Sequence, residues 1–130
     1  MITDVELYRK ALLSAEHAYA PYSKYHVGAA VLTTDGDVYE GANIENASFG
    51  ATICAERVAA TKAIYDGKSI IAVAVAIEGS GEVPYPCGIC RQFLSEFGLD
   101  IRVITGKDED HLETYALSEL LPKAFTTFDR

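Results

Sequence analysis

The chain has 130 residues, which is the size of one domain and long enough to bury a core without disulfide bonds. The formal net charge is −8 at pH 7. A field of that sign repels polyanions, so we expect no nucleic-acid partner and favour a small neutral substrate. The longest apolar run, 70–77, is too short to cross a membrane, so no membrane partner is expected either. The first six residues lack the pattern of a secretory signal, so we expect a cytoplasmic location with reduced thiols.

The first third of the chain predicts a helix and a hairpin. Residues 4–19 carry apolar side chains at helical spacing, and Thr3 with Glu6 resembles a capping box at the start of that helix. Residues 27–32 and 38–42 have the composition of strands, and the Asp-Gly pair between them is a hairpin turn signal. These two strands are therefore predicted to be antiparallel.

The remaining pattern predicts an α/β fold. Residues 52–65 are Ala-rich and helical, with Thr52 as a candidate N-cap, and 70–77 is a strand covered on both faces. A helix over 87–97 and a strand over 101–105 follow, and shorter signals predict a strand at 114–115 and a helical turn at 117–121. This order predicts one domain over residues 1–130, a three-layer α/β/α arrangement with a mixed five-stranded sheet.

Three cysteines form the most informative pattern in the chain. Cys54, Cys87 and Cys90 are the only cysteines, and the predicted helices place them at two helix starts. The spacing of three puts the second and third sulfurs on one side of their helix. Two helix N-termini then point at one place, where their partial positive charge stabilises thiolates. Three thiolates leave one position of a tetrahedral zinc ion open, which is typical of catalytic zinc.

A carboxylate and a guanidinium accompany the cysteines. Glu56 follows Cys54 by two residues, and we infer that it stands beside the open position as a base and is not a ligand. Arg57 is placed to donate hydrogen bonds to thiolate sulfur and so to offset the negative charge of the site, with Arg91 a weaker candidate. We therefore predict one Zn²⁺ per chain and metal-assisted addition of water.

Three other interpretations of the cysteines stay open. A structural zinc site needs a fourth protein ligand, and no histidine lies at ligand spacing from either cysteine group. The cysteines could instead be buried core thiols. The Cys-x-x-Cys pair could also be redox-active, although a thioredoxin-like setting is missing.

Six blocks of sequence extend the pattern beyond the cysteines. They are Ala18–Tyr25, Val27–Ala30, Gly41–Ala47, Cys54–Arg57, Pro86–Gln92 and Leu120–Phe125. In this order they resemble cytidine deaminases of the short, free-nucleoside type, and the resemblance runs from about residue 18 to residue 125. The two-part cysteine signature with a glutamate that is not a ligand is the signature of zinc deaminases.

The resemblance implies a reaction and the residues that perform it. Cytidine and 2′-deoxycytidine would lose ammonia after water adds at C4, with Glu56 moving protons to N3 and to the amino group. Asn43 and Glu45 match the positions that bind the ribose 3′-hydroxyl. The Ala55 amide and the Pro86 carbonyl match the groups that hold the pyrimidine O2 and the departing amino group. Without the resemblance, Asn43 and Glu45 would be interpreted as a polar turn after a strand.

Three aromatic residues match further family positions. Tyr25 stands where the family usually has a phenylalanine that packs on the base, and its hydroxyl needs a partner; as bare sequence it is equally a core residue. Phe49 stands where tyrosine is often found. Phe125 matches an aromatic that reaches into a neighbouring subunit's site, because short members of the family are homotetramers with shared active sites. Eight tyrosines and five phenylalanines supply apolar surface for such an assembly.

Three rival functions share part of this pattern. A deaminase of a modified aminopyrimidine nucleoside such as blasticidin S would carry the same zinc signature, but the Asn43–Asn46 block favours an unmodified sugar. A nucleic-acid editing deaminase needs a basic groove, which the scattered Lys and Arg residues do not predict. In a non-catalytic zinc-stabilised interaction domain, Glu56 would be incidental.

Overall fold

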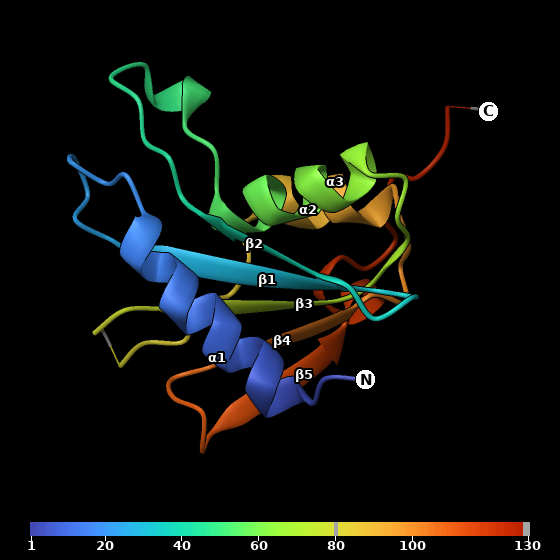
Figure 1. Cartoon of the computed structure of the whole chain (residues 1–130). Helices are drawn as coiled ribbons and strands as arrows, with labels where there is room; N and C mark the ends of the chain where they lie inside the picture. Colours follow the sequence, from blue (N-terminus) through green and yellow to red (C-terminus); the bar gives the residue numbers. More distant parts are fainter. Residues whose placement is uncertain (80, 129–130) are drawn as a thin grey trace.

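The protein is described here from a computed structural model, which covers residues 1–79 and 81–128. Its elements are, in chain order, α1 (Asp4–Ser14), β1 (Val27–Thr33), β2 (Val38–Ala42), α2 (Ala55–Tyr65), β3 (Ile70–Ile77), α3 (Gly88–Ser95), β4 (Arg102–Gly106), β5 (Leu112–Ala116) and α4 (Leu117–Leu120). Two short 3₁₀ segments, η1 (Ala15–His17) and η2 (Phe49–Ala51), lie in the connections. Figure 1 shows how these elements are arranged.

The five strands of the described residues form one mixed sheet in the order β2-β1-β3-β4-β5. β1 is antiparallel to both β2 and β3, with Ala30 opposite Glu40 on one side and Ala74 on the other. β3 is parallel to β4, and β4 is antiparallel to β5. A parallel pair needs a crossover, which the segment containing α3 supplies. The prediction of a mixed five-stranded α/β fold is confirmed.

Helices cover both faces of this sheet, as Figure 1 shows. α1 packs on one face and α2 on the other. Alternate residues of a strand point to opposite faces, so each strand contributes side chains to both interfaces. The cluster under α1 includes Leu7, Tyr8, Ala11, Leu32, Ala72, Ala74 and Ile104. The cluster on the other face, which α3 and α4 also join, includes Ala55, Ala59, Ala63, Val73, Val75, Leu94, Val103 and Leu117. The three predicted layers are therefore present, with the core divided between two interfaces.

A glycine on β2 sets how closely α2 approaches the sheet. A Cβ atom built on Gly41 would lie 2.5 Å from the Ala59 nitrogen and 2.8 Å from the Ala55 oxygen. Both atoms belong to the backbone of α2, so no side-chain rotation would relieve the contact. Gly41 therefore allows the first turns of α2 to rest directly on β2.

Two predicted helix boundaries are wrong by three residues or more, and the helix predicted over 87–97 is shorter, Gly88–Ser95. The helix predicted over 4–19 ends at Ser14 and continues only as η1. The helix predicted from 52 begins at Ala55, and its N-cap is Cys54, not Thr52. The backbone stays extended before Cys54 because Ile53 pairs with Ile44, each amide donating to the other's carbonyl at 2.9 Å. This pairing between distant residues overrides the local helical propensity.

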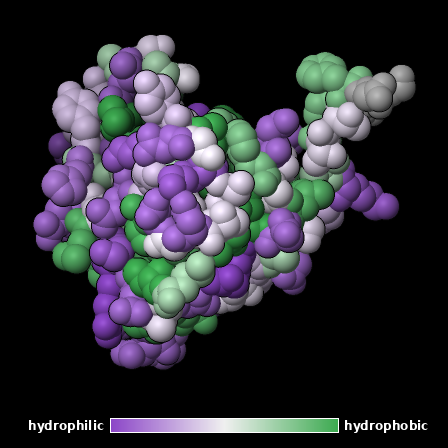
Figure 2. Space-filling view, turned by 45° about the vertical axis from the view of Figure 1, so that its right-hand side comes forward, coloured by the Kyte–Doolittle hydropathy of each residue, from purple (hydrophilic) through white to green (hydrophobic). Residues whose placement is uncertain are grey.

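The segments that join α1 to β1, β2 to α2 and β3 to α3 emerge at the same end of the sheet (Figure 1). The C-terminal segment leaves the opposite part of the molecule, and Figure 2 shows that it projects beyond the body. It carries two exposed aromatic residues, Phe125 and Phe128, whose ring centroids lie 5.6 Å apart. No helix among the described residues is long and apolar enough to span a bilayer.

Candidate active site

A pocket of about 450 Å³ lies where β3 ends and β1 begins. Val27 at the start of β1 and Ile77 at the end of β3, which are paired in the sheet, both line it. The first residues of α2 and the segment before α3 complete the wall. Its volume lies within the usual range for small-molecule sites, about 300–1,000 Å³.

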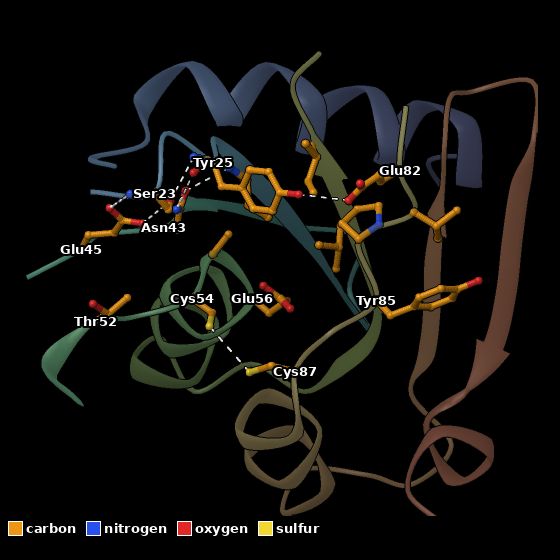
Figure 3. Close-up of a pocket in the computed structure, with 16 residues that line it drawn as sticks. Ser23, Tyr25, Asn43, Glu45, Thr52, Cys54, Glu56, Glu82, Tyr85 and Cys87 are labelled. Atoms are coloured by element: carbon orange, nitrogen blue, oxygen red, sulfur yellow. Dashed lines mark hydrogen bonds between the residues drawn. The ribbon is translucent and has the colours of Figure 1, made fainter. Parts of the chain in front are cut away.

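The three cysteine sulfurs meet at one side of this pocket, and all lie within 4.8 Å of one another. Cys54 is the N-cap of α2 and Cys87 is the N-cap of α3, both with extended backbone, and their sulfurs are 3.7 Å apart. Cys90 lies in the first turn of α3 and is buried. Figure 3 shows Cys54 and Cys87 at the pocket wall, with Glu56 beside Cys54. An N-cap side chain points past the helix end, which explains how two helices present sulfur to one place.

Hydrogen bonding shifts the pKa values of two of these thiols in opposite directions. Hydrogen bonding with Cys90, and then with Arg57, lowers the pKa of the Cys54 thiol to about 5. The hydrogen bond with Cys54, and then burial, raise the pKa of the Cys90 thiol. Arg57 Nη2 lies 3.6 Å from Cys54 Sγ, which places the Arg57 guanidinium as the predicted donor to thiolate sulfur. Its Nε is buried and has no hydrogen-bond partner among the described residues. Arg91 instead binds the carbonyls of Pro86 and Leu120, at 2.7 and 2.8 Å.

Glu56 is the only carboxylate side chain that is buried among the described residues, with 4% of its surface exposed. It lies in the first turn of α2 and lines the pocket. Burial raises the pKa of its carboxyl to about 7, and the neighbouring Cys54 adds to the shift. A carboxyl with such a pKa exchanges protons readily near neutral pH.

The donor set fits one zinc ion. Zinc is bound in proteins by thiolate sulfur, and three sulfurs this close together supply three of its four positions. No other group of three or more His, Cys, Asp or Glu side chains with this geometry occurs in the described part of the chain. Cys54 and Cys87 line the pocket while Cys90 is buried behind them, so the remaining position of the ion would be open to a small molecule on the pocket side.

Asn43 and Glu45 line the opposite side of the pocket and organise a turn there. The Asn43 amide accepts from the Val27 N–H at 3.0 Å and donates to the Tyr25 carbonyl at 2.8 Å. The Glu45 carboxylate accepts from the Ser23 amide and from its hydroxyl, and these contacts lower the pKa of Glu45. Each side chain keeps hydrogen-bonding capacity for a ligand, because an amide and a carboxylate each have about four sites.

The other predicted substrate residues divide between the pocket and its surroundings. Tyr25 and Ala55 line the pocket. Phe49 lies in an adjoining hollow, where its ring meets Tyr22 edge to face with centroids 5.9 Å apart. Pro86 is buried beside the pocket, and its carbonyl already accepts from Arg91. Phe125 lies in a separate hollow next to α3, so it does not reach the pocket of its own chain.

Several lining residues were not predicted from the sequence. Ser23 belongs to a block that was recognised, but no role was assigned to it. Glu82, Val83, Pro84 and Tyr85 form a continuous stretch of the wall. The Tyr85 position directly before Pro86-Cys87 could have indicated proximity to the sulfurs. Nothing in the local pattern marks Glu82, which lies in an irregular Gly- and Pro-containing loop.

Fold and metal centre together place the chain in the class of zinc-binding deaminases. Comparison with known families is consistent with this assignment. The family model described as the cytidine and deoxycytidylate deaminase zinc-binding region matches residues 1–107, so the chain belongs to this family. The predicted family is thereby confirmed, and its characterised relatives are enzymes.

Individual relatives cover nearly the whole chain. A cytidine deaminase of Halalkalibacterium halodurans is 46% identical over 125 residues, spanning 95% of this chain and 94% of its own length. The crystal structure of cytidine deaminase from Burkholderia pseudomallei superposes with a TM-score of 0.89 at 39% identity, covering 95% of this chain and all of that one. That from Mycobacterium tuberculosis gives a TM-score of 0.85 at 36% identity, covering 98% of this chain and all of that one. A blasticidin-S deaminase of Bacillus cereus is more distant, 30% identical over 80% of this chain and 79% of its own.

Proposed function

We propose that this protein is a zinc-dependent cytidine and 2′-deoxycytidine deaminase that acts on free nucleosides. The observation that carries the proposal is a cluster of three sulfurs next to one buried carboxyl, Glu56, at the wall of a pocket that Asn43 and Glu45 also line. The sulfurs and the carboxyl supply the chemistry, and the two polar side chains on the far wall supply groups for a sugar. The relatives named cytidine deaminase, at 40–46% identity, support the same substrate.

Cys54, Cys87 and Cys90 would hold a zinc ion, which would supply a Lewis acid that makes water nucleophilic at neutral pH. Water adds to C4 of the pyrimidine, and Glu56 accepts the proton that the water loses and delivers it to N3. Glu56 then moves the proton of the new C4 hydroxyl to the amino group. The C4–N bond breaks as ammonia leaves and a C4 carbonyl forms, so that cytidine and water become uridine and ammonia. One carboxyl suffices because it first accepts and then donates.

Charge at the pocket favours a nucleoside over a nucleotide. The lining carries three carboxylates, Glu45, Glu56 and Glu82, and no Lys, Arg or His side chain lines it among the described residues. A 5′-phosphate would enter a field of its own sign without a cation to bind it. The net charge of −8 opposes a nucleic-acid substrate for the same reason.

Three broader features belong to the same proposal. A homotetramer with shared active sites is supported by the exposed Phe49 and Phe125, which lie outside the pocket of their own chain. A single domain over 1–130 is supported by the one sheet that joins both core clusters. A cytoplasmic location and a place in pyrimidine salvage are supported by three unbridged thiols and a nucleoside substrate.

Turnover of four compounds tests the proposal. The zinc-loaded protein is incubated with cytidine, 2′-deoxycytidine, cytidine 5′-monophosphate and blasticidin S, and the ultraviolet change on deamination is followed while zinc per chain is measured. We expect turnover of the two nucleosides, little with the phosphate and little with blasticidin S. Absence of cytidine turnover in a sample with one zinc per chain would refute the proposed function, and preferred turnover of blasticidin S would favour the rival substrate.

A further inference from the structure

Tyr25 is held in place by hydrogen bonds at both ends of the residue. Its N–H donates to Ser23 Oγ at 3.0 Å and its carbonyl accepts from Asn43 Nδ2 at 2.8 Å. At the far end of the side chain, the hydroxyl donates to Glu82 Oε2 at 3.0 Å. Figure 3 shows the ring between these contacts, across the pocket from Cys54 and Glu56. The ring is therefore fixed at its base by the turn that carries it and at its tip by a second segment.

The second segment connects the pocket opening to the metal centre. Glu82 lies 57 positions after Tyr25, in the connection between β3 and α3, and both residues line the pocket. The same connection is anchored more deeply where the Pro84 carbonyl accepts from the buried Thr105 hydroxyl at 3.2 Å, and it leads into Cys87. The Tyr25–Glu82 bond thus joins the two sides of the pocket near its opening.

The hydrogen bond between Tyr25 and Glu82 keeps its donor proton at neutral pH, but its net strength is modest because both groups are exposed to water. Donation to Glu82 raises the pKa of the Tyr25 hydroxyl, so the donor proton is retained at neutral pH. The Tyr25 side chain is 47% exposed and Glu82 is exposed, so water competes for both groups. A planar ligand that enters the pocket would displace some of that water, and a hydrogen bond strengthens where the surroundings are less polar. The bond should therefore contribute more to ligand binding than to folding.

We propose that Glu82 is a positioning residue, which acts through the Tyr25 hydroxyl to fix the Tyr25 ring as one wall of the pyrimidine site. The inference rests on the proposed function, since the ring needs a planar substrate to pack against. Among the described residues, neither the Tyr25 nor the Glu82 side chain forms a hydrogen bond with the cysteine sulfurs or with Glu56. The pair should therefore affect KM and leave kcat close to that of the parent.

Steady-state kinetics with cytidine tests the pair. Tyr25→Phe removes the hydroxyl and keeps the ring, and Glu82→Ala removes the acceptor. We expect each to raise KM roughly 3- to 10-fold, which is what the loss of one hydrogen bond predicts, with kcat within about 2-fold. The KM of the double variant should not exceed the KM of the more impaired single variant, because both changes break the same hydrogen bond. Glu82→Gln keeps an uncharged acceptor and should recover part of the loss.

Two control variants separate the bond from general effects. Tyr65→Phe removes a hydroxyl from a side chain that is 91% exposed at the end of α2, and Glu78→Ala removes a charge from the same connection as Glu82, outside the pocket. Both should leave KM unchanged. The proposal is overturned if Glu78→Ala raises KM as much as Glu82→Ala, if Tyr25→Phe matches the parent, or if the losses in the double variant add. An inactive parent would refute the proposed function, and the role of the pair with it, whereas an active parent with unaffected variants would refute the pair alone.

Discussion

The contact between β2 and α2 leads to a sharp prediction for Gly41→Ala. The added Cβ would lie 2.5 Å from the Ala59 nitrogen and 2.8 Å from the Ala55 oxygen. Ordinary carbon contacts begin at about 3.5 Å, so α2 must move away from β2 by roughly 1 Å. Forcing extra volume into a packed interface costs about 1–3 kcal/mol. At roughly 4 °C per kcal/mol for a chain of this size, the melting temperature should fall by roughly 4–12 °C.

The same displacement should reach the active site. The first turn of α2 carries Glu56, and its N-cap is Cys54, so a movement of about 1 Å changes the position of both relative to α3. A misplacement of that size can lower activity by about 10²-fold. Cytidine turnover, zinc per chain and the urea midpoint are measured together on zinc-loaded protein. We expect all three to fall.

Gly50→Ala is the matched control for this experiment. A Cβ at Gly50 meets no atom within 4 Å, and its backbone does not have a positive φ. The free energy of unfolding of this variant should stay within about 0.5 kcal/mol of the parent. If Gly41→Ala were as stable and as active as Gly50→Ala, the close approach of α2 to β2 would not be what positions the site.

Three further variants extend the account. Arg57→Ala should lower turnover by roughly 10- to 100-fold, and more than it lowers zinc content, because the guanidinium donates to Cys54; complete zinc loss would make Arg57 a structural residue instead. Asp35→Asn should lower the urea midpoint at pH 7, because Lys68 holds the pKa of Asp35 at about 2 in the folded chain; the difference from the parent should shrink as pH falls below 3.8 towards 2, and a pH-independent difference would contradict this. Phe125→Ala should raise KM roughly tenfold, although Phe125 lies outside the pocket of its own chain. Native mass spectrometry of the parent protein should show four chains. A Phe125→Ala variant that is monomeric and fully active would refute the shared site.

The sequence predicted those parts of the fold and site that depend on local pattern. The β-branched and alanine run of β3 indicated a strand covered on both faces, and its residues do divide between the two core clusters. The spacing of Cys87 and Cys90 at a helix start placed two sulfurs together, and the helix after Cys54 brought the third. These features require only the geometry of one element and the direction in which its first turn points.

Features that depend on contacts between distant segments could not be predicted in this way. Thr52 looked like an N-cap, but pairing of Ile53 with Ile44 keeps the chain extended until Cys54. The partner of the Tyr25 hydroxyl, Glu82, lies 57 positions away in a connection without periodic pattern. The engagement of the Pro86 carbonyl by Arg91 likewise follows from how α3 begins, which the composition of the loop does not reveal.

The most direct test of the central claim compares the parent with Glu56→Gln in one experiment that measures zinc per chain and uridine formed from cytidine. Gln has nearly the same shape as Glu but cannot carry a proton, and it leaves all three cysteines in place. The account predicts about one zinc per chain in both proteins, and uridine formation that falls by at least 10²-fold in Glu56→Gln. Turnover within a few-fold of the parent, or a parent that binds no zinc, would contradict it.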